Sequence, residues 1–417
     1  MRFVVKWFLP MTTRLYYQDS FLYDFDAEVR DVVDSPRPAL ILDRTAFYPT
    51  SGGQVFDTGW ISSDAGSKMR VTEVADAEDG KVIHYLEAPT KEVKPGDRVR
   101  GEIDAERRRD HMQQHSGQHV LSAAFLRLYN MGTVSFHMGD EYCSIDLDTP
   151  ALAKEQVESA EHLANEIVLE NRTVDIRLVT REEAGKLGLR KLPPTERDEL
   201  RLIDIRDFDL CACGGTHVSQ TGQIASILMR KMEKVRQGWR VEFVAGLRAV
   251  ATARRDFTVL TETAALFSAN LYEVPQQARK ALDEIRSLRK QLEQSQDELA
   301  AAHATSLLGQ TAETNGRKIV VRALSERDMN FVKLMAQKLT RLSSNAIALL
   351  ATISPQPALV FAQSPGQPFD MGALMKEAMA KLGGGGGGSK DMAQGGVPKA
   401  EGIDAVLSTL AATLSDR

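Results

Sequence analysis

Cysteine is scarce in this chain, and its scarcity limits how the protein can be stabilised. Three cysteines occur among 417 residues, at positions 143, 211 and 213. Three thiols are too few for a disulfide framework, which excludes the class of small disulfide-rich secreted domains and suits a reducing compartment. We therefore expect a cytoplasmic protein.

Long apolar runs are also absent. No stretch of the sequence approaches the roughly 20 apolar residues that cross a membrane as a helix. The N-terminus has a basic residue and a brief apolar run but no small-residue cleavage site, so we expect no signal peptide. Met11 is an alternative start, in which case residues 1–10 are a disordered or misassigned extension.

Charge of one sign is not in large excess. The sequence has 52 lysines and arginines against 57 aspartates and glutamates, a net charge of −5. This balance argues against a general polyanion binder, so any contact with nucleic acid must come from a local basic surface. Hydrophobic residues make up 43% of the chain, which is ordinary for a globular protein, and the length allows about two to four domains.

Two short motifs hold the residues best suited to bind a metal. The first is HSGQH at residues 115–119, followed by apolar residues at helical spacing that place both histidines on one helix face. The second is CGGTH at residues 213–217, where two glycines allow a tight turn. Three imidazoles and one thiolate match the donor set of tetrahedral zinc. The sequence therefore predicts a Zn²⁺ site formed by His115, His119, Cys213 and His217.

The chemical role of this site stays open. The metalloprotease motif HExxH has a glutamate directly after its first ligand, but Ser116 stands there, so that class is disfavoured. Four protein ligands fill a tetrahedral site, as in structural zinc sites. For catalysis, one ligand must be displaced, the ion must accept a fifth ligand, or it must orient the substrate without activating water.

The two motifs carry a family resemblance. HSGQH followed at a distance by CGGTHV resembles the editing domain shared by alanyl- and threonyl-tRNA synthetases. The chain as a whole resembles the long form of AlaX, a family of free-standing alanyl-tRNA editing proteins. The zinc ligands of that family correspond to His115, His119, Cys213 and His217 without departure.

The segment 43–59 contains a glycine motif with two interpretations. Its residues alone predict a glycine turn between two strands. The resemblance implies instead that it packs over the zinc pocket, where Thr45 helps to recognise a serine hydroxyl by hydrogen bonding. It further implies that the substrate is contacted by Gly52, Gly53 and Gln54. Ser51 replaces the first of the three glycines that are frequent in the family.

Other candidate site residues lie outside these motifs. His137 belongs to a predicted hairpin at residues 132–148 and is a candidate catalytic or substrate contact; a partly exposed strand histidine is the alternative. Arg236 and Arg240 belong to a basic hairpin, and the resemblance favours contact with tRNA phosphates there. The alternative is an ordinary solvated face.

The pattern of elements predicts an α+β multidomain protein. Short strands separated by turn residues indicate a β-barrel-like domain at 12–100, followed by an α/β zinc editing domain at 101–255. Residues 256–310 have a heptad seam, which predicts a helical hairpin or a coiled-coil linker; packing on the preceding helix is favoured over packing on a second subunit. Alternating strands and helices predict a C-terminal α/β domain at 318–417.

A run of six glycines interrupts this last domain. We interpret the run as a loop whose bare amides can approach a phosphate or a stacked base. The pattern resembles the C-terminal domain shared by alanyl-tRNA synthetase and DHH phosphoesterases, which in the synthetase binds the tRNA elbow. No Asp-His-His motif is present, so phosphoesterase chemistry is not implied. The predicted tRNA-binding glycines are Gly383, Gly384, Gly385, Gly386, Gly387 and Gly388.

The resemblance implies a zinc-dependent hydrolase that removes the wrong amino acid, chiefly serine and secondly glycine, from tRNA(Ala). A synthetase pocket for alanine excludes serine poorly, because one added hydroxyl is a weak discriminator, so a second site is needed. Two alternatives stay open: a non-catalytic zinc module that binds tRNA or a synthetase, and a hydrolase of another small ester. A homodimer through the helical or C-terminal region is a further expectation.

Overall fold

The computed structural model describes residues 11–89, 92–190, 199–354 and 356–416. The expectation for residues 1–10 lies outside this described part. The chain divides into two compact units, Met1–Glu262 and Thr263–Arg417. Among the described residues, no helix is long and apolar enough to cross a membrane.

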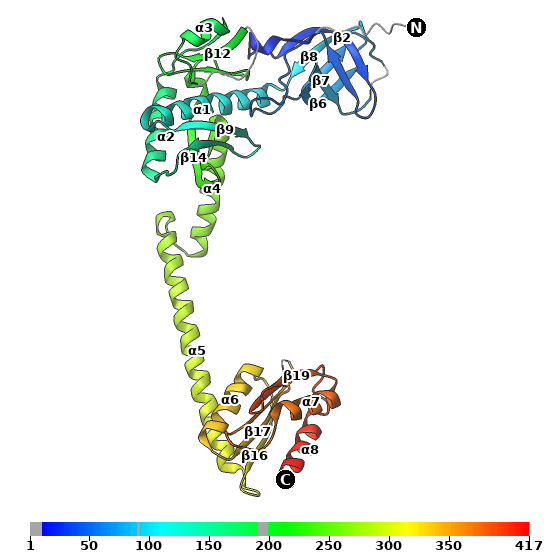
Figure 1. Cartoon of the computed structure of the whole chain (residues 1–417), viewed down its shortest axis with the longest axis vertical. Helices are drawn as coiled ribbons and strands as arrows, with labels where there is room; N and C mark the ends of the chain where they lie inside the picture. The colour runs from blue at the N-terminus through cyan, green and yellow to red at the C-terminus, as the bar shows by residue number, and fades with distance from the viewer. Residues whose placement is uncertain (1–10, 90–91, 191–198, 355, 417) are drawn as a thin grey trace. The chain divides into compact units, whose positions relative to one another are not determined.

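The first unit begins with a closed β-barrel (Figure 1). Neighbouring strands pair antiparallel around the whole barrel. Buried and exposed residues alternate along most strands because successive side chains point to opposite faces, which fills the interior with apolar groups. The predicted barrel is therefore confirmed. Its strands, in spatial order, are β2 (Asp24–Val33), β3 (Ala39–Leu42), β7 (Val82–Leu86), β6 (Lys68–Asp76), β5 (Gly59–Ser63) and β8 (Arg98–Ile103).

Helix α1 (Ala105–Tyr129) follows the barrel and is the central element of the zinc motif region. Asp104 caps its N-terminus by accepting a hydrogen bond from the Arg107 amide, and Asn130 ends it in the left-handed conformation. Nearly every residue between His111 and Phe125 is buried, so polar side chains in this stretch must find partners inside the protein.

Two sheets accompany α1. The predicted hairpin at residues 132–148 forms as β9 and β10, and helix α2 (Lys154–Leu169) packs its apolar face into the same core. A second, three-stranded sheet leads into the CGGTH motif. The first sheet contains, in spatial order, β14 (Ile227–Val235), β15 (Gly238–Ala245), β10 (Cys143–Asp148) and β9 (Gly132–Met138). The second contains β11 (Val174–Thr180), β12 (Glu199–Ile205) and β13 (Asp209–Ala212).

The heptad seam lies on one long helix. Helices α4 (Gly246–Leu266) and α5 (Val274–Gln310) are separated by a short 3-10 turn, and Pro275 lies in the first turn of α5. The seam residues Ile285, Leu288 and Leu292 are 46%, 55% and 59% exposed. The packing of this seam on the preceding helix stays a prediction.

The second unit contains the predicted α/β domain. Its five-stranded sheet pairs β16 with β17 in parallel and the other strands antiparallel. Alternate residues of β17 belong to separate apolar clusters: α6 and the end of α5 pack on one face, α7 and α8 on the other. The strands, in order, are β16 (Lys318–Leu324), β17 (Ala346–Thr352), β18 (Ala358–Gln363), β20 (Met392–Gly396) and β19 (Gly385–Gly388). The helices are α6 (Met329–Leu342), α7 (Met371–Leu382) and α8 (Ile403–Ser415).

The glycine run is a strand rather than the predicted loop. Residues 385–388 form β19, an edge strand that pairs with β20, while Gly383 ends α7 with φ at 67°. A Cβ at Gly386 would lie 2.5 Å from the Gly395 Cα, and one at Gly388 would lie 2.4 Å from the Ala393 Cα. The glycines therefore allow an unusually close approach of two strands, which composition alone did not indicate.

Candidate metal centre

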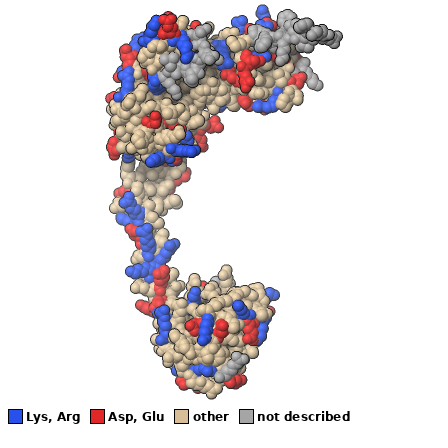
Figure 2. Space-filling view, viewed as in Figure 1, with Lys and Arg blue, Asp and Glu red and all other residues tan. Residues whose placement is uncertain are grey.

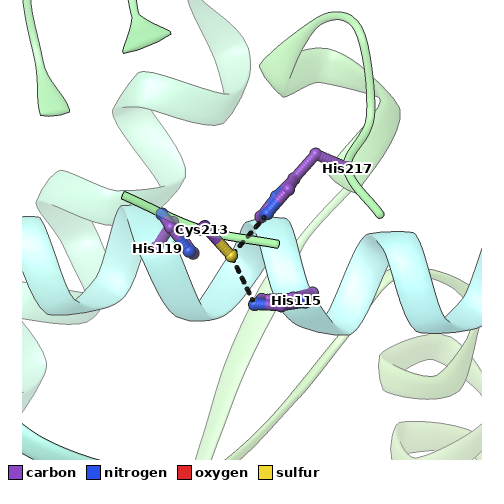
Figure 3. A group of neighbouring side chains, drawn as sticks. All are labelled: His115, His119, Cys213 and His217. Atoms are coloured by element: carbon purple, nitrogen blue, oxygen red, sulfur yellow. Dashed lines mark hydrogen bonds between the residues drawn. The ribbon is translucent and has the colours of Figure 1, made fainter. Parts of the chain in front are cut away.

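The two predicted ligand pairs converge on one point. His115 and His119 come from α1, whereas Cys213 and His217 come from the turn after β13; Figure 3 shows the four side chains facing one another. Their ligand atoms all lie within 4.8 Å of one another. Cys213 Sγ is 3.4 Å from His115 Nε2 and 3.3 Å from His217 Nε2. These distances are close to the edge of about 3.6 Å expected between nitrogen and sulfur on tetrahedral zinc. The cluster could therefore hold a metal ion.

A polar group lies on the far side of each imidazole, and two of the three rings make a hydrogen bond to it. His115 Nδ1 is 2.8 Å from Gln54 Oε1, and His217 Nδ1 is 3.1 Å from Ser116 Oγ. His119 Nδ1 is 3.5 Å from an Asp209 carboxylate oxygen and has no hydrogen bond among the described residues. With each Nδ1 turned to such a group, each Nε2 is left as the metal-binding atom.

The electrostatics of the metal-free cluster favour the ligand forms of Cys213 and His217, whereas His119 holds a proton that it must release when a metal binds. Burial opposes the Cys213 thiolate, but the surrounding imidazoles hold its pKa well below the ordinary value. Burial lowers the pKa of His217, which keeps that ring neutral. Burial also acts to lower the pKa of His119, but the Cys213 thiolate and Asp209 raise it to about 10. A thiolate among buried imidazoles is the form that binds a soft divalent cation.

The glycine motif reaches the cluster through Gln54. This side chain is fully buried; its Nε2 donates to Thr216 Oγ1 at 2.8 Å, and its Oε1 also accepts from the Thr216 amide at 3.1 Å. A Cβ at Gly53 would lie 2.4 Å from the Phe136 carbonyl oxygen, and one at Gly215 would lie 2.1 Å from His115 Cε1. Gln54 thus joins both ligand motifs, and glycines on either side allow the close approach.

Thr45 makes its hydrogen bonds within the barrel domain. It is completely buried, and its Oγ1 lies 2.8 Å from His84 Nε2 inside the barrel. The same hydroxyl accepts from the Phe47 amide. A role for Thr45 toward a serine hydroxyl stays a prediction, and it requires this hydroxyl to leave His84.

The remaining predicted site residues are spread over the surface. His137 is exposed on the edge strand β9, opposite Ser144. Arg236 is exposed in the turn between β14 and β15. Arg240 makes a two-pronged ion pair with Asp146, at 2.7 and 2.9 Å, which occupies much of its hydrogen-bonding capacity. Gly52 is exposed, with φ at 57°. The predicted tRNA-binding glycines at 383–388 belong to the second unit.

One buried ion pair near the site was not expected from the sequence. Arg108 of α1 and Asp57 of the glycine motif are both fully buried and hydrogen bonded, and the Asp57 carboxylate accepts the Tyr48 amide. Arg108 also donates to the carbonyls of Ser20 and Ala46, at 2.9 and 2.6 Å. The pair therefore attaches the motif to α1. Arg108 lies within a run of charged residues that looks solvent-exposed in the sequence, so no pattern distinguished it.

Three family models match separate parts of the chain. Residues 10–107 match the model described as tRNA synthetases class II (A), and residues 200–241 match the threonyl and alanyl tRNA synthetase second additional domain. Residues 309–416 match the DHHA1 domain. The barrel, the segment with the second ligand pair and the C-terminal domain thus each have a counterpart.

Whole-chain relatives extend these matches. The chain is 30% identical over 390 residues to the alanyl-tRNA editing protein AlaX-L of Pyrococcus horikoshii, covering 93% of this chain and 95% of that protein. It is also 32% identical over 395 residues to the alanine–tRNA ligase of Pyrococcus furiosus and 34% identical over 395 residues to that of Thermococcus kodakarensis. In both cases it covers 93% of this chain but only 42% of the ligase. Because one relative aligns along almost its full length, the chain belongs to the family of the alanyl-tRNA editing protein AlaX-L.

Proposed function

We propose that this chain is a zinc-dependent deacylase that removes serine, and secondly glycine, from mischarged tRNA(Ala). The observation that carries the proposal is the convergence of four ligand atoms within 4.8 Å, each imidazole with its Nδ1 turned to a polar group. The similarity to a relative named as an alanyl-tRNA editing protein supports an ester of tRNA as the substrate.

The donor set favours zinc over other common cations. A thiolate excludes Mg²⁺ and Ca²⁺, which take oxygen ligands, and a tetrahedral arrangement of three imidazoles and a thiolate suits Zn²⁺. Bound zinc would supply a Lewis acid for the ester carbonyl or a site for the substrate's amino group. His115, His119, Cys213 and His217 would hold it; Gln54 and Ser116 orient two of the rings by hydrogen bonds, and the Asp209 carboxylate lies beside the third.

Contact with tRNA is supported by basic surface in both units. In the first unit, Arg236 is exposed and available for a phosphate. In the second unit, Figure 2 shows lysine and arginine side chains gathered along part of α5. Phosphate contacts of this kind give affinity and position rather than sequence specificity. The basic residues of α5 are Arg279, Lys280, Arg286, Arg289 and Lys290.

We propose that a second copy of the chain packs against the exposed heptad seam of α5. Ile285, Leu288 and Leu292 follow heptad spacing, and they and the neighbouring Leu282 are each about half exposed, a surface that coiled-coil pairing would bury. Sedimentation should then show a dimer that Leu288→Lys converts to monomer. A monomeric wild-type chain would remove this part of the proposal.

The central experiment is deacylation of Ser-, Gly- and Ala-tRNA(Ala), with a threonyl-tRNA substrate for comparison. We expect release of serine, slower release of glycine and sparing of alanine. Cys213→Ala should lose both zinc and activity, because one of the four ligands is gone. Cys211→Ala, two residues away and outside the cluster, is the matched control. Zinc and tRNA binding without faster loss of serine would establish a non-catalytic binding module instead.

A further inference from the structure

The ring of His119 differs from those of the other two candidate histidine ligands. Gln54 and Ser116 form hydrogen bonds with the Nδ1 atoms of the other two imidazoles. His119 Nδ1 is buried and has no hydrogen bond among the described residues, although Asp209 Oδ2 lies 3.5 Å away. Buried polar atoms are almost always paired, so this nitrogen calls for an explanation.

Two more buried atoms without a hydrogen bond belong to the same group of side chains. One is Asp209 Oδ2 itself, and the other is Arg190 Nη1. Arg190 Nη2 lies 3.4 Å from Asp209 Oδ2, and the two side chains are 15% and 5% exposed. A pair that only holds the fold together can close fully, as Arg240 and Asp146 do with two contacts of 2.7 and 2.9 Å. The ion pair alone therefore does not account for the placement of Asp209.

The backbone fixes both side chains beside the cluster. Asp209 is the first residue of β13, the strand that leads into the motif with Cys213. The Arg190 amide donates to the Leu210 carbonyl at 3.1 Å, which holds residue 190 next to the same strand. These anchors are main-chain interactions, so they place the two side chains independently of the ion pair between them.

Charge gives a reason for a carboxylate at this place. Zn²⁺ held by one thiolate and neutral imidazoles would leave one uncompensated positive charge in a buried site. Among the described residues, no carboxylate other than that of Asp209 lies within ion-pair distance of a ligand imidazole. A histidine that donates its second ring N–H to a carboxylate is also oriented by it and binds metal more strongly.

We propose that Asp209 and Arg190 form a pair that positions His119 for the metal. Asp209 accepts the Nδ1–H of His119, and Arg190 holds the carboxylate in place for that hydrogen bond. Both residues act through His119, so they are positioning residues and not catalytic ones. The inference rests on the zinc site of the proposed function, but it does not depend on which ester is hydrolysed.

The test is a double-mutant cycle on the Zn²⁺ affinity of the full chain, measured by competition with a chromophoric chelator. Asp209→Asn, which keeps the shape of the side chain and removes its charge, should weaken Zn²⁺ binding about 10- to 100-fold. Arg190→Met should weaken it about tenfold in the wild-type background. It should have no further effect in Asp209→Asn, because the arginine acts through the carboxylate. Arg190→Lys, which keeps the charge, should recover most of the affinity.

A second readout reports the hydrogen bond itself. In the zinc-loaded wild type, the Nδ1 proton of His119 should give a slowly exchanging, downfield NMR signal, and Asp209→Asn should lose it. Asp204→Asn is the matched control, since Asp204 pairs with Arg177 at 2.9 Å on the same three-stranded sheet but outside the cluster. This control should keep both the signal and the wild-type affinity.

The outcomes separate this inference from the proposed hydrolysis. Wild-type Zn²⁺ affinity in Asp209→Asn and Arg190→Met, or losses that simply add in the double variant, would overturn the positioning pair even if the wild type deacylates Ser-tRNA(Ala). A wild type that binds Zn²⁺ and shows the predicted coupling, but never releases serine, would overturn the hydrolysis and leave the pair standing.

Discussion

At the scale of single residues, the metal cluster depends on side chains that never touch the ion. Gln54 is the clearest case, because one amide group contacts His115 from the first ligand pair and Thr216 next to the second. It also ties the glycine motif of the barrel to both. Removing the Gln54 side chain would therefore break three hydrogen bonds at once: the one to His115 Nδ1 and those to the hydroxyl and the amide of Thr216.

The first prediction concerns Gln54→Met, which keeps the length of the side chain and removes its hydrogen bonds. We expect zinc affinity to fall by about 10- to 100-fold, the usual effect of removing a partner of a metal-bound histidine. A competition assay against a chromophoric chelator measures this directly. Gln237→Met, at an exposed glutamine in the turn between β14 and β15, should bind zinc as the wild type does. Equal affinities in the two variants would show that Gln54 does not support the site.

The second prediction concerns His84 and acid stability. Burial lowers the pKa of this ring to about 4, from 6.5 in the unfolded chain, so the unfolded state takes up a proton first. The barrel therefore has its full stability above pH 6.5 and loses it as the pH falls toward 4, by about 3 kcal/mol from this group.

Urea unfolding at several pH values would measure this loss. His84→Gln should make the free energy of unfolding less dependent on pH between 6.5 and 4. His162→Gln, at a histidine whose side chain is 77% exposed, should keep the wild-type slope. A His84→Gln variant as acid-sensitive as the wild type would contradict the assignment of this slope to His84.

At the scale of elements, α1 and the edge strand β19 differ from what their composition alone predicts, because the neighbouring elements decide which of their residues are buried or crowded. The polar residues of α1 are buried because strands, a helix and the barrel motif surround it. In β19, only every second position sterically requires glycine. A Cβ at Gly386 would collide with the neighbouring strand, whereas a Cβ at Gly387 would have no atom within 4 Å.

This alternation gives the third prediction. Gly386→Ala should destabilise the second unit by about 1–3 kcal/mol, because the new methyl group collides with the backbone of β20. Gly387→Ala should change stability by less than about 0.5 kcal/mol. Thermal unfolding of the two variants is the measurement. Equal melting temperatures would mean that the two strands are not paired in this register.

At the scale of the whole molecule, the chain has two units with separate apolar cores. The metal cluster belongs entirely to the first unit. The second unit contributes the basic residues of α5 and the glycine strand.

The fourth prediction follows from this division. A chain that ends at Leu266, after α4, should retain kcat for Ser-tRNA(Ala) within about twofold, because no residue of the cluster is lost. Its KM should rise by at least about tenfold, because two linked binding surfaces give more affinity than one. Steady-state deacylation of both chains is the measurement. An unchanged KM would show that the second unit does not bind the substrate.

Much of this protein could be predicted from the sequence. The barrel, the hairpin of β9 and β10, the strands β16 to β18 with the helices α6 to α8, and the four candidate metal ligands follow from local patterns, whereas β19 and β20 do not. Side-chain periodicity, turn residues and donor chemistry are properties of neighbouring positions, so they can be recognised without a structure.

Only the tertiary structure decided which distant groups meet. It placed Gln54 against His115, buried Arg108 against Asp57, turned the Thr45 hydroxyl toward His84 and paired the glycine run with β20. Each of these contacts joins segments whose own sequence is compatible with another arrangement. The choice between them depends on the packing of whole elements, because a buried polar group must find its partner wherever the fold brings one within reach.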